Sequence, residues 1–187
     1  IDEKLKFNTN LRNKLLNLAN GKRIILSLSR LEEAKGIDIL IDGYSEYRAG
    51  VKDIVLFIVG YGSDKYQTHL KNKIKKLKLE GNVFLLGKMD NEEKNTLYDV
   101  ANIFILPSYN EGFSITVLEA FRQRLPVIAT TGTPFSKIVE KKCGLYIKPS
   151  KKDIFNAFIS YSKLSDQELA SMGEKGYKWA AEEFDIK

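Results

Sequence analysis

The chain has 187 residues, of which 43% are hydrophobic and 29% are charged. These values suit one globular domain with its own core and exclude a fibrous or low-complexity chain. The longest unbroken apolar run, residues 54–59, has six residues, and Cys143 is the single cysteine, which excludes a membrane-spanning helix, a disulfide framework and a cysteine-rich metal site. The net charge of +6, with 24 lysines among 30 positive residues, favours either an anionic partner (a nucleotide, a nucleic acid or an acidic membrane) or a solvated lysine-rich surface.

Short apolar runs alternate along the chain with stretches in which apolar residues recur at helical spacing. Strands are predicted at residues 23–29, 53–59, 82–86, 103–106, 127–130 and 144–147. Helices are predicted within residues 37–44, 70–77, 92–100, 115–123, 153–163 and 166–183, while residues 1–22 lead into the first strand. Apolar strands that alternate with helices indicate an α/β fold: a doubly wound, Rossmann-like parallel sheet of about six strands with helices on both faces.

In such a sheet, ligands bind beyond the carboxyl ends of the strands, so the loops there are candidates for a functional site. The first loop carries Arg30 where the strand ends and Lys35 where the next helix begins. A guanidinium and an ammonium beside a helix N-terminus would hold a diphosphate, because all three favour negative charge. Alternatively, both side chains lie on the surface and pair with Glu32 or Glu33.

The second and third loops carry two further candidates. Gly60 begins a Gly-Tyr-Gly turn that lacks the third glycine of a dinucleotide fingerprint, because Lys65 occupies that position. The turn would still let a ligand approach the backbone at Gly60. Lys88 and Met89 would lie against a nucleotide base, or form an ordinary loop. The lysines of the intervening helix would form a solvated face, or bind a membrane surface or a nucleic acid.

The fourth loop carries two carboxylates, Glu111 and Glu119, separated by seven residues. The intervening amides that open the next helix belong to Gly112, Phe113, Ser114 and Ile115. This arrangement would hold a sugar nucleotide end to end, with Glu111 on the sugar, the amides on the phosphates and Glu119 on the ribose. The alternative is an acidic loop residue and a helix glutamate in a surface ion pair.

Two residue types that often carry chemistry are scarce in this chain. His69 is the single histidine and lies among the lysines of a predicted helix, which disfavours a Ser-His-Asp triad and a histidine-bearing metal site. Cys143 begins a predicted strand and is interpreted as a small core residue. The sequence therefore predicts no metal ligands.

Over nearly the whole chain, these motifs resemble the C-terminal domain of the group 1 glycosyltransferases of the GT-B fold, the family-4 retaining enzymes. The segments that carry the resemblance are Arg30 with Lys35-Gly36, Val59-Gly60-Tyr61-Gly62, Phe84-Leu85-Leu86-Gly87, Pro107-Ser108 with Glu111-Gly112-Phe113-Ser114 and Glu119-Ala120, Leu125-Pro126-Val127-Ile128-Ala129-Thr130, and Glu183-Phe184.

The resemblance implies that residues 1–187 are a single nucleotide-sugar-binding domain, one half of a GT-B enzyme whose missing N-terminal domain binds the acceptor. It implies Glu111, Arg30 and Lys35 as catalytic residues, with the two cations neutralising the departing diphosphate and Glu111 fixing the donor sugar. Glu119 would hold the ribose, and the backbone near Met89 would contact the base. The resemblance implies neither a metal nor a cofactor besides the donor, and no nucleic acid.

The expected reaction is the retaining transfer of a hexose from a UDP or GDP sugar to a glycan or a lipid-linked acceptor, in the synthesis of bacterial surface polysaccharide or glycolipid. Because the chain begins at Ile1 and not at methionine, it is expected to be a fragment that binds nucleotide but transfers little or no sugar by itself. The parent enzyme is expected in the cytoplasm, with its lysine-rich surface against the acidic inner face of the membrane.

Three departures from the family pattern keep other functions open. Ser29 and Arg124 stand where the family has glycine, and a non-glycine residue at a helix end costs about 1 kcal/mol. Residues 131–135 read Thr-Gly-Thr-Pro-Phe in place of Gly-Gly-x-Pro-Glu, which alters the expected contacts to the donor sugar. The alternatives are a non-catalytic nucleotide-sugar-binding module, a sugar-nucleotide epimerase of related architecture, and a nucleic-acid-binding domain that uses the lysine-rich helix.

Overall fold

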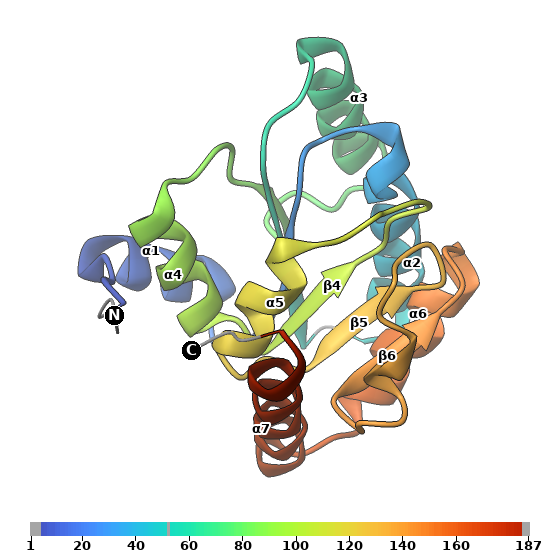
Figure 1. Ribbon diagram of the computed structural model, residues 1–187. Coiled ribbons are helices and arrows are strands. Elements are labelled where there is room, and N and C mark those ends of the chain that lie inside the picture. Colours follow the sequence, from blue (N-terminus) through green and yellow to red (C-terminus); the bar gives the residue numbers. More distant parts are fainter. Residues whose placement is uncertain (1–4, 52, 185–187) are drawn as a thin grey trace.

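The computed structural model describes residues 5–51 and 53–184. Its centre is a six-stranded sheet in the order β3-β2-β1-β4-β5-β6, in which every neighbouring pair is parallel (Figure 1). The strands are β1 Arg23–Leu28, β2 Ile54–Val59, β3 Val83–Leu85, β4 Ile103–Leu106, β5 Val127–Thr130 and β6 Gly144–Ile147. The predicted doubly wound, Rossmann-like sheet of about six strands is therefore confirmed.

The helices that follow the strands begin and end within a few residues of the predicted positions, except that α2 ends six residues after its predicted stretch and α3 starts six residues before its own. They are α2 Ile37–Gly50, α3 Asp64–Lys76, α4 Asn91–Val100, α5 Ile115–Arg122, α6 Lys151–Ser162 and α7 Asp166–Glu183. The lead-in segment contains a helix that was not predicted, α1 Thr9–Ala19, which Asn8 caps through its side chain. Lys35 lies in a 3-10 turn, Glu33–Lys35, and not at the start of α2 as predicted.

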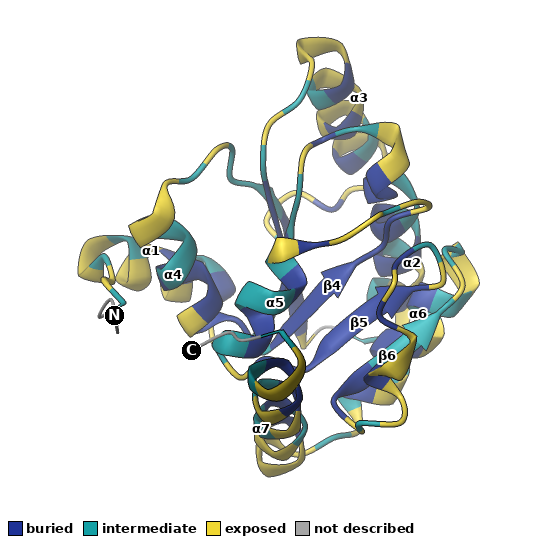
Figure 2. Cartoon of the chain, viewed as in Figure 1, coloured by how far each residue is buried: buried dark blue, intermediate teal, exposed yellow. Residues whose placement is uncertain are grey.

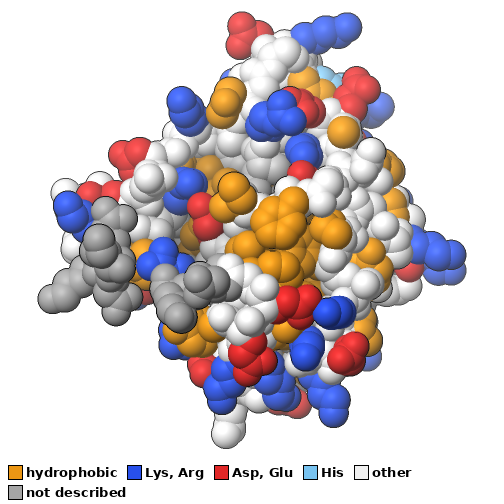
Figure 3. Space-filling view, viewed as in Figure 1, with side chains coloured by type: hydrophobic (Ala, Val, Ile, Leu, Met, Phe, Trp, Pro, Cys, Tyr) orange, Lys and Arg blue, Asp and Glu red, His pale blue; other side chains and the backbone are white. Residues whose placement is uncertain are grey.

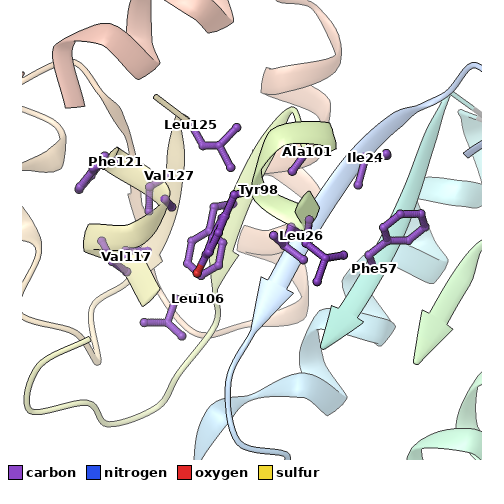
Figure 4. Close-up of a cluster of buried hydrophobic side chains, with 14 of the residues drawn as sticks. Ile24, Leu26, Phe57, Tyr98, Ala101, Leu106, Val117, Phe121, Leu125 and Val127 are labelled. Carbon is purple, nitrogen blue, oxygen red and sulfur yellow. The ribbon is translucent and has the colours of Figure 1, made fainter. Parts of the chain in front are cut away.

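Helices cover both faces of the sheet, because successive residues of each strand point to opposite sides. The first core cluster includes Leu26 and Phe57 and packs against α1, α4, α5 and α7. The second core cluster includes Ile25 and Leu56 and packs chiefly against α2, α3 and α6. Figure 2 shows the strands buried between these layers, and Figure 4 shows part of the first core cluster.

Cys143 lies in the first core cluster with no exposed surface. Burial raises the pKa of its thiol to about 12, so the side chain is neutral at ordinary pH. This confirms its interpretation as a core residue. Among the helices of the described ranges, none combines the length and the apolar character that crossing a membrane requires.

All six strands run in one direction, so their carboxyl ends meet at one rim of the sheet. The loops that leave this rim contain all of the predicted site residues except Ile115 and Glu119, which lie on α5 directly after the fourth loop. The fold therefore gathers the candidate residues at one edge of the molecule, as the sequence predicts.

Candidate functional site

The loops after β1, β4 and β5 pack backbone against backbone at this rim. The amide of Tyr109 donates to the carbonyl of Ala34 at 2.9 Å, and the amide of Glu111 donates to the carbonyl of Gly132 at 2.7 Å. Gly36 has a φ of +67°, and a Cβ placed on it would lie 2.1 Å from the carbonyl oxygen of Pro107. These contacts fix the backbone on which Lys35 and Glu111 stand.

Lys35 and Glu111 meet across this contact. Their Nζ and Oε2 atoms lie 2.6 Å apart, and the two side chains are only 11% and 16% exposed. The hydroxyl of Ser108 approaches the same carboxylate oxygen at 3.5 Å, the limit of a hydrogen bond. The structure thus brings together two of the three predicted catalytic residues, and Lys35 pairs with Glu111 in preference to Glu32 or Glu33.

Arg30, the third predicted catalytic residue, lies on the surface. Its side chain is 62% exposed, and its Nη1 atom lies 2.8 Å from Oε1 of Glu32. This is the surface ion pair considered as the alternative for Arg30. An exposed ion pair of this kind is held weakly, so the guanidinium is able to turn toward an anion. Its contact with a diphosphate stays a prediction.

Four successive amides follow Glu111 without an acceptor. Within the ranges that the structure describes, no hydrogen-bond acceptor takes the N–H groups of Gly112, Phe113, Ser114 and Ile115. Ser114 is the N-cap residue of α5 and makes no capping bond. Free amides at a helix N-terminus favour an anion. A Cβ on Gly112 would meet nothing within 4 Å, so its surroundings are open to a ligand.

Hydrophobic side chains gather over the start of α5, near the middle of the face in Figure 3. Phe113 and Ile115, which belong to this part of the chain, are 52% and 67% exposed. Phe113 packs against Phe135 and Phe184, with ring centroids 6.1 and 6.0 Å away. The amides of the fourth loop therefore lie beside a partly exposed aromatic cluster.

Glu119 faces α4 and not Glu111. Its Oε2 atom accepts a hydrogen bond from the hydroxyl of Tyr98 at 2.9 Å, and its Oε1 atom lies 3.4 Å from Nζ of Lys94. The carboxylate borders a cavity of about 390 Å³ between α4 and α5, to which Arg122 also contributes. The two carboxylates of the predicted pair thus have separate partners: Glu111 forms a largely buried ion pair with Lys35, and Glu119 forms a partly exposed one with Lys94, as the alternative expects for the helix glutamate.

The loops after β2 and β3 lie side by side. The amide of Gly60 donates to the carbonyl of Gly87 at 2.8 Å. Gly60 has a φ of +145°, and a Cβ on it would lie 1.8 Å from the carbonyl oxygen of Ser29, so the neighbouring loop already requires glycine there. The ammonium of Lys88 lies 5.3 Å from the ring centroid of Tyr61. Met89 packs against the first core cluster. Contacts of these residues with a ligand stay predictions.

The departures from the family pattern have distinct local reasons. Arg124 does adopt a left-handed conformation, with φ of 56°, and is held by an ion pair with Glu174 at 2.8 Å and by the ring of Tyr177. Ser29 is not among the described residues with positive φ, so that position does not require glycine. Phe135 is 1% exposed and fills the aromatic cluster, so the position brings no carboxylate to the rim.

Three neighbours of the two glutamates, Ser108, Lys94 and Tyr98, were not predicted from the sequence. Lys94 and Tyr98 are four residues apart and so share one face of α4. That spacing indicates a shared face but not which element it meets. For the part of the chain that the structure describes, no three His, Cys, Asp or Glu side chains gather as metal ligands would.

The lysine-rich helix α3 has one lysine held by carboxylates. Lys73 lies 3.5 Å from Asp38 and 2.8 Å from Asp42, while the other lysines of α3 are exposed. This fits the solvated face considered in the sequence analysis. In addition, the helix exposes no Phe, Tyr or Trp side chain on which nucleic-acid bases could stack, and its exposed ring, His69, lies 2.6 Å from Asp38.

Comparison with known proteins finds relatives of this chain. The sequence model described as "Glycosyl transferases group 1" matches residues 9–179. Mannosylfructose-phosphate synthase of Agrobacterium fabrum is 32% identical over 138 residues, which cover 70% of this chain and 30% of that protein. Alpha-monoglucosyldiacylglycerol synthase of Streptococcus pneumoniae is 26% identical over 175 residues, covering 93% and 39%. This chain therefore spans less than half the length of these relatives.

A solved structure shows the same fold. HepE of Anabaena in complex with UDP-glucose superposes with a TM-score of 0.82 and 23% identity, covering 96% of this chain and 50% of that one. At this identity the likeness concerns the arrangement of strands and helices. It agrees with the Rossmann-like sheet that the strand order gives.

Proposed function

We infer that this chain, which belongs to the family of group 1 glycosyl transferases, is the part of a glycosyltransferase that binds the nucleotide-sugar donor. One observation carries the proposal: Lys35 and Glu111 meet 2.6 Å apart, directly before four amides that have no acceptor in the described chain. A cation, a carboxylate and free helix amides at the carboxyl rim of a parallel sheet suit a ligand that has both phosphates and hydroxyls.

In the proposed complex, the amides of the fourth loop and Lys35 hold the diphosphate, and Arg30 leaves Glu32 to join them. Negative charge builds on the diphosphate as the bond to the sugar breaks, so fixed cations and amides stabilise the transition state more than the bound donor. Glu111 accepts hydrogen bonds from the sugar and keeps Lys35 in place. Glu119 holds the ribose, and the backbone near Lys88 and Met89, with Gly60 close by, contacts the base.

The proposed reaction moves a hexose from a UDP or GDP sugar to a glycan or lipid-linked acceptor, with retention at the anomeric carbon. Two relatives support this range: HepE was solved with UDP-glucose, and the streptococcal relative is named for the synthesis of a glucosylated diacylglycerol. The proposal includes no metal or other cofactor, because Lys35, Arg30 and the amides would offset the charge of the leaving group. A full-length enzyme that keeps its activity in EDTA would agree with this, and complete loss would contradict it.

The proposal treats residues 1–187 as one C-terminal domain. The short span of this chain relative to its relatives supports a missing N-terminal domain that binds the acceptor. An enzyme that glycosylates lipid-linked acceptors would act in the cytoplasm at the inner face of the membrane, and the exposed lysines of α3 would favour acidic lipids there.

Calorimetric titration with UDP, GDP, ADP and uridine tests donor binding. Arg30→Ala should weaken binding of the preferred diphosphate about tenfold and leave the nucleoside unaffected, since an ion-paired hydrogen bond is lost. Arg124→Ala is the matched control, because Arg124 also forms an exposed pair with a glutamate but precedes β5 at the opposite rim. Absence of diphosphate binding by the wild type contradicts the proposal, and equal losses for diphosphate and nucleoside contradict the role of Arg30.

A non-catalytic nucleotide-sugar-binding module is the second candidate, favoured by Phe135, which fills the aromatic cluster where the family pattern has a glutamate. Such a module would bind the diphosphate as proposed, but the full-length protein would neither hydrolyse nor transfer the sugar. An epimerase would release a different sugar nucleotide without any acceptor. Incubating the full-length protein with donor alone, then with candidate acceptors, distinguishes the three functions by their products.

A further inference from the structure

The carboxylate of Glu119 accepts a hydrogen bond from a buried tyrosine. Tyr98 is 2% exposed and lies in the first core cluster, where Figure 4 shows its ring near Leu106 and Val117. Its hydroxyl lies 2.9 Å from Oε2 of Glu119 and 3.3 Å from the carbonyl oxygen of Thr116. A phenol has one proton to donate, and the shorter contact with a charged acceptor takes it.

The hydroxyl of Tyr98 stays a donor at any ordinary pH. Burial, followed by the charge of Glu119 and the hydrogen bond to it, raises the pKa of Tyr98 well above its ordinary value. A core position filled for packing alone would suit phenylalanine, because a buried hydroxyl costs free energy unless it is hydrogen-bonded. The hydroxyl therefore points to a function at Glu119 in addition to the packing of the ring.

The second oxygen of Glu119 is held more loosely. Lys94 approaches Oε1 at 3.4 Å, and the side chains of Lys94 and Glu119 are 25% and 32% exposed. The contact with Lys94 is longer and more exposed to solvent than the hydrogen bond from Tyr98. A ligand hydroxyl would therefore displace Lys94 from Glu119 at a lower cost in free energy than it would displace Tyr98. One oxygen is thus fixed from the core, and the other is available at the surface.

We propose that Tyr98 is a positioning residue for the ribose of the bound nucleotide: by holding Oε2 of Glu119, it presents Oε1 to the ribose hydroxyls. The inference rests on the proposed donor site and adds to it the group that orients Glu119. An unrestrained glutamate side chain loses rotamer freedom when it binds. A glutamate already fixed by Tyr98 has lost most of that freedom before the ligand arrives.

The test compares nucleotides that have and lack the ribose hydroxyls. The chain is titrated with UDP or GDP, whichever binds more tightly, and with the 2′-deoxy and 3′-deoxy forms of the same diphosphate. Tyr98→Phe should weaken binding of the ribonucleotide about tenfold and leave at least one deoxy form unchanged within about twofold. In a Glu119→Ala background, Tyr98→Phe should have no further effect on binding.

Tyr44→Phe is the matched control. Tyr44 is 0% exposed and donates its hydroxyl proton to the carbonyl of Ile54 at 2.7 Å, but it lies in the second core cluster. Loss of the Tyr44 hydroxyl should lower the free energy of unfolding without changing the preference for the ribonucleotide over its deoxy forms. Should Tyr98→Phe fail to fold, Tyr98→Met fills the space and also lacks the hydroxyl. If Tyr98→Phe or Tyr98→Met keeps the full preference for the ribonucleotide, the inference is overturned. If the wild type binds no nucleotide, the donor site itself is contradicted.

Discussion

At the scale of single residues, the ion pair between Lys35 and Glu111 is the most consequential contact of the rim. Both side chains are largely withdrawn from water, so each has lost hydration that the other chiefly replaces. Removing one partner leaves a buried charge without compensation, which costs more than the pair itself contributes. The two residues proposed for catalysis, Lys35 and Glu111, therefore also stabilise the rim of the sheet.

Lys35→Met should lower the free energy of unfolding by about 3 kcal/mol, because Glu111 would remain buried and charged. Urea denaturation of the variant measures this loss. The double variant Lys35→Met with Glu111→Leu should recover much of it, since no lone charge then remains. The coupling is contradicted if the double variant loses as much unfolding free energy as the two single variants together. It is also contradicted if Lys35→Met is as stable as the wild type.

Gly112 has no structural reason to be glycine. It is exposed, and a Cβ on it would meet nothing within 4 Å. Gly112→Ala should therefore change the free energy of unfolding by no more than about 0.5 kcal/mol. If a diphosphate lies close to the amide of Gly112, the same change should weaken its binding about tenfold.

Gly50→Ala provides the control for that measurement, because Gly50 at the end of α2 also has open space around it. Neither stability nor nucleotide affinity should fall in this variant, since alanine suits a helix better than glycine. If Gly112→Ala leaves the nucleotide affinity unchanged, the phosphates do not lie close to the amide of Gly112.

At the scale of elements, the loops depend on glycines that allow two backbones to touch. Gly36 and Gly21 both have positive φ, +67° and +74°, but only Gly36 has a neighbour, the carbonyl of Pro107. Gly21→Ala should cost about 1 kcal/mol for the left-handed conformation alone. Gly36→Ala should cost about 3 kcal/mol, since the loops must also separate. Equal midpoints of urea unfolding for the two variants would mean that the loop contact contributes nothing.

Helices α2 and α3 are joined by Asp38, which has three partners on α3. It accepts a hydrogen bond from Tyr66 at 2.7 Å and lies 2.6 Å from Nε2 of His69 and 3.5 Å from Lys73. Burial raises the pKa of Asp38, but the hydrogen bonds from Tyr66 and His69 and the charges of His69 and Lys73 outweigh burial and lower it.

Because its folded-state pKa is lowered, Asp38 stabilises the protein above the pKa of the unfolded chain, about 3.9, and loses this effect as the pH falls through the folded value. The difference in unfolding free energy between the wild type and Asp38→Asn should therefore be present above about pH 4 and shrink as the pH falls below that value. A difference that stays constant across this range would show that the carboxylate charge is not what joins the helices.

The sequence predicts elements better than the contacts between them. Strands such as Ile103–Leu106 and Val127–Thr130 lie where predicted, because a buried parallel strand is apolar throughout and stands out from a helix. Helix α1 was missed because more than half of its residues are polar and it has only Leu15 and Ala19 as buried residues. The pair of Lys35 with Glu111, 76 residues apart, arises from loop packing that no local pattern encodes.

At the scale of the whole molecule, one sheet separates two core clusters and belongs to both. Neighbouring residues such as Ile25 and Leu26 in β1, or Leu56 and Phe57 in β2, point into opposite clusters. Neither cluster can therefore lose its packing without exposing strands on which the other depends. Figure 1 shows the helices on the two sides of this shared sheet.

The described chain should consequently unfold as one cooperative unit. Trp179 is the single tryptophan, and it packs against Phe121 of α5 at 5.5 Å in the first core cluster, so its fluorescence reports that side. Far-ultraviolet circular dichroism reports the helices of both sides. In urea, the two signals should give one midpoint. A nucleotide at about 100 times its Kd should raise the unfolding free energy by about 2.7 kcal/mol and move both midpoints together to higher urea. If the tryptophan signal changes before the helical signal, the cluster beneath α5 and α7 unfolds separately. A nucleotide would then shift only the transition of the part of the molecule that binds it.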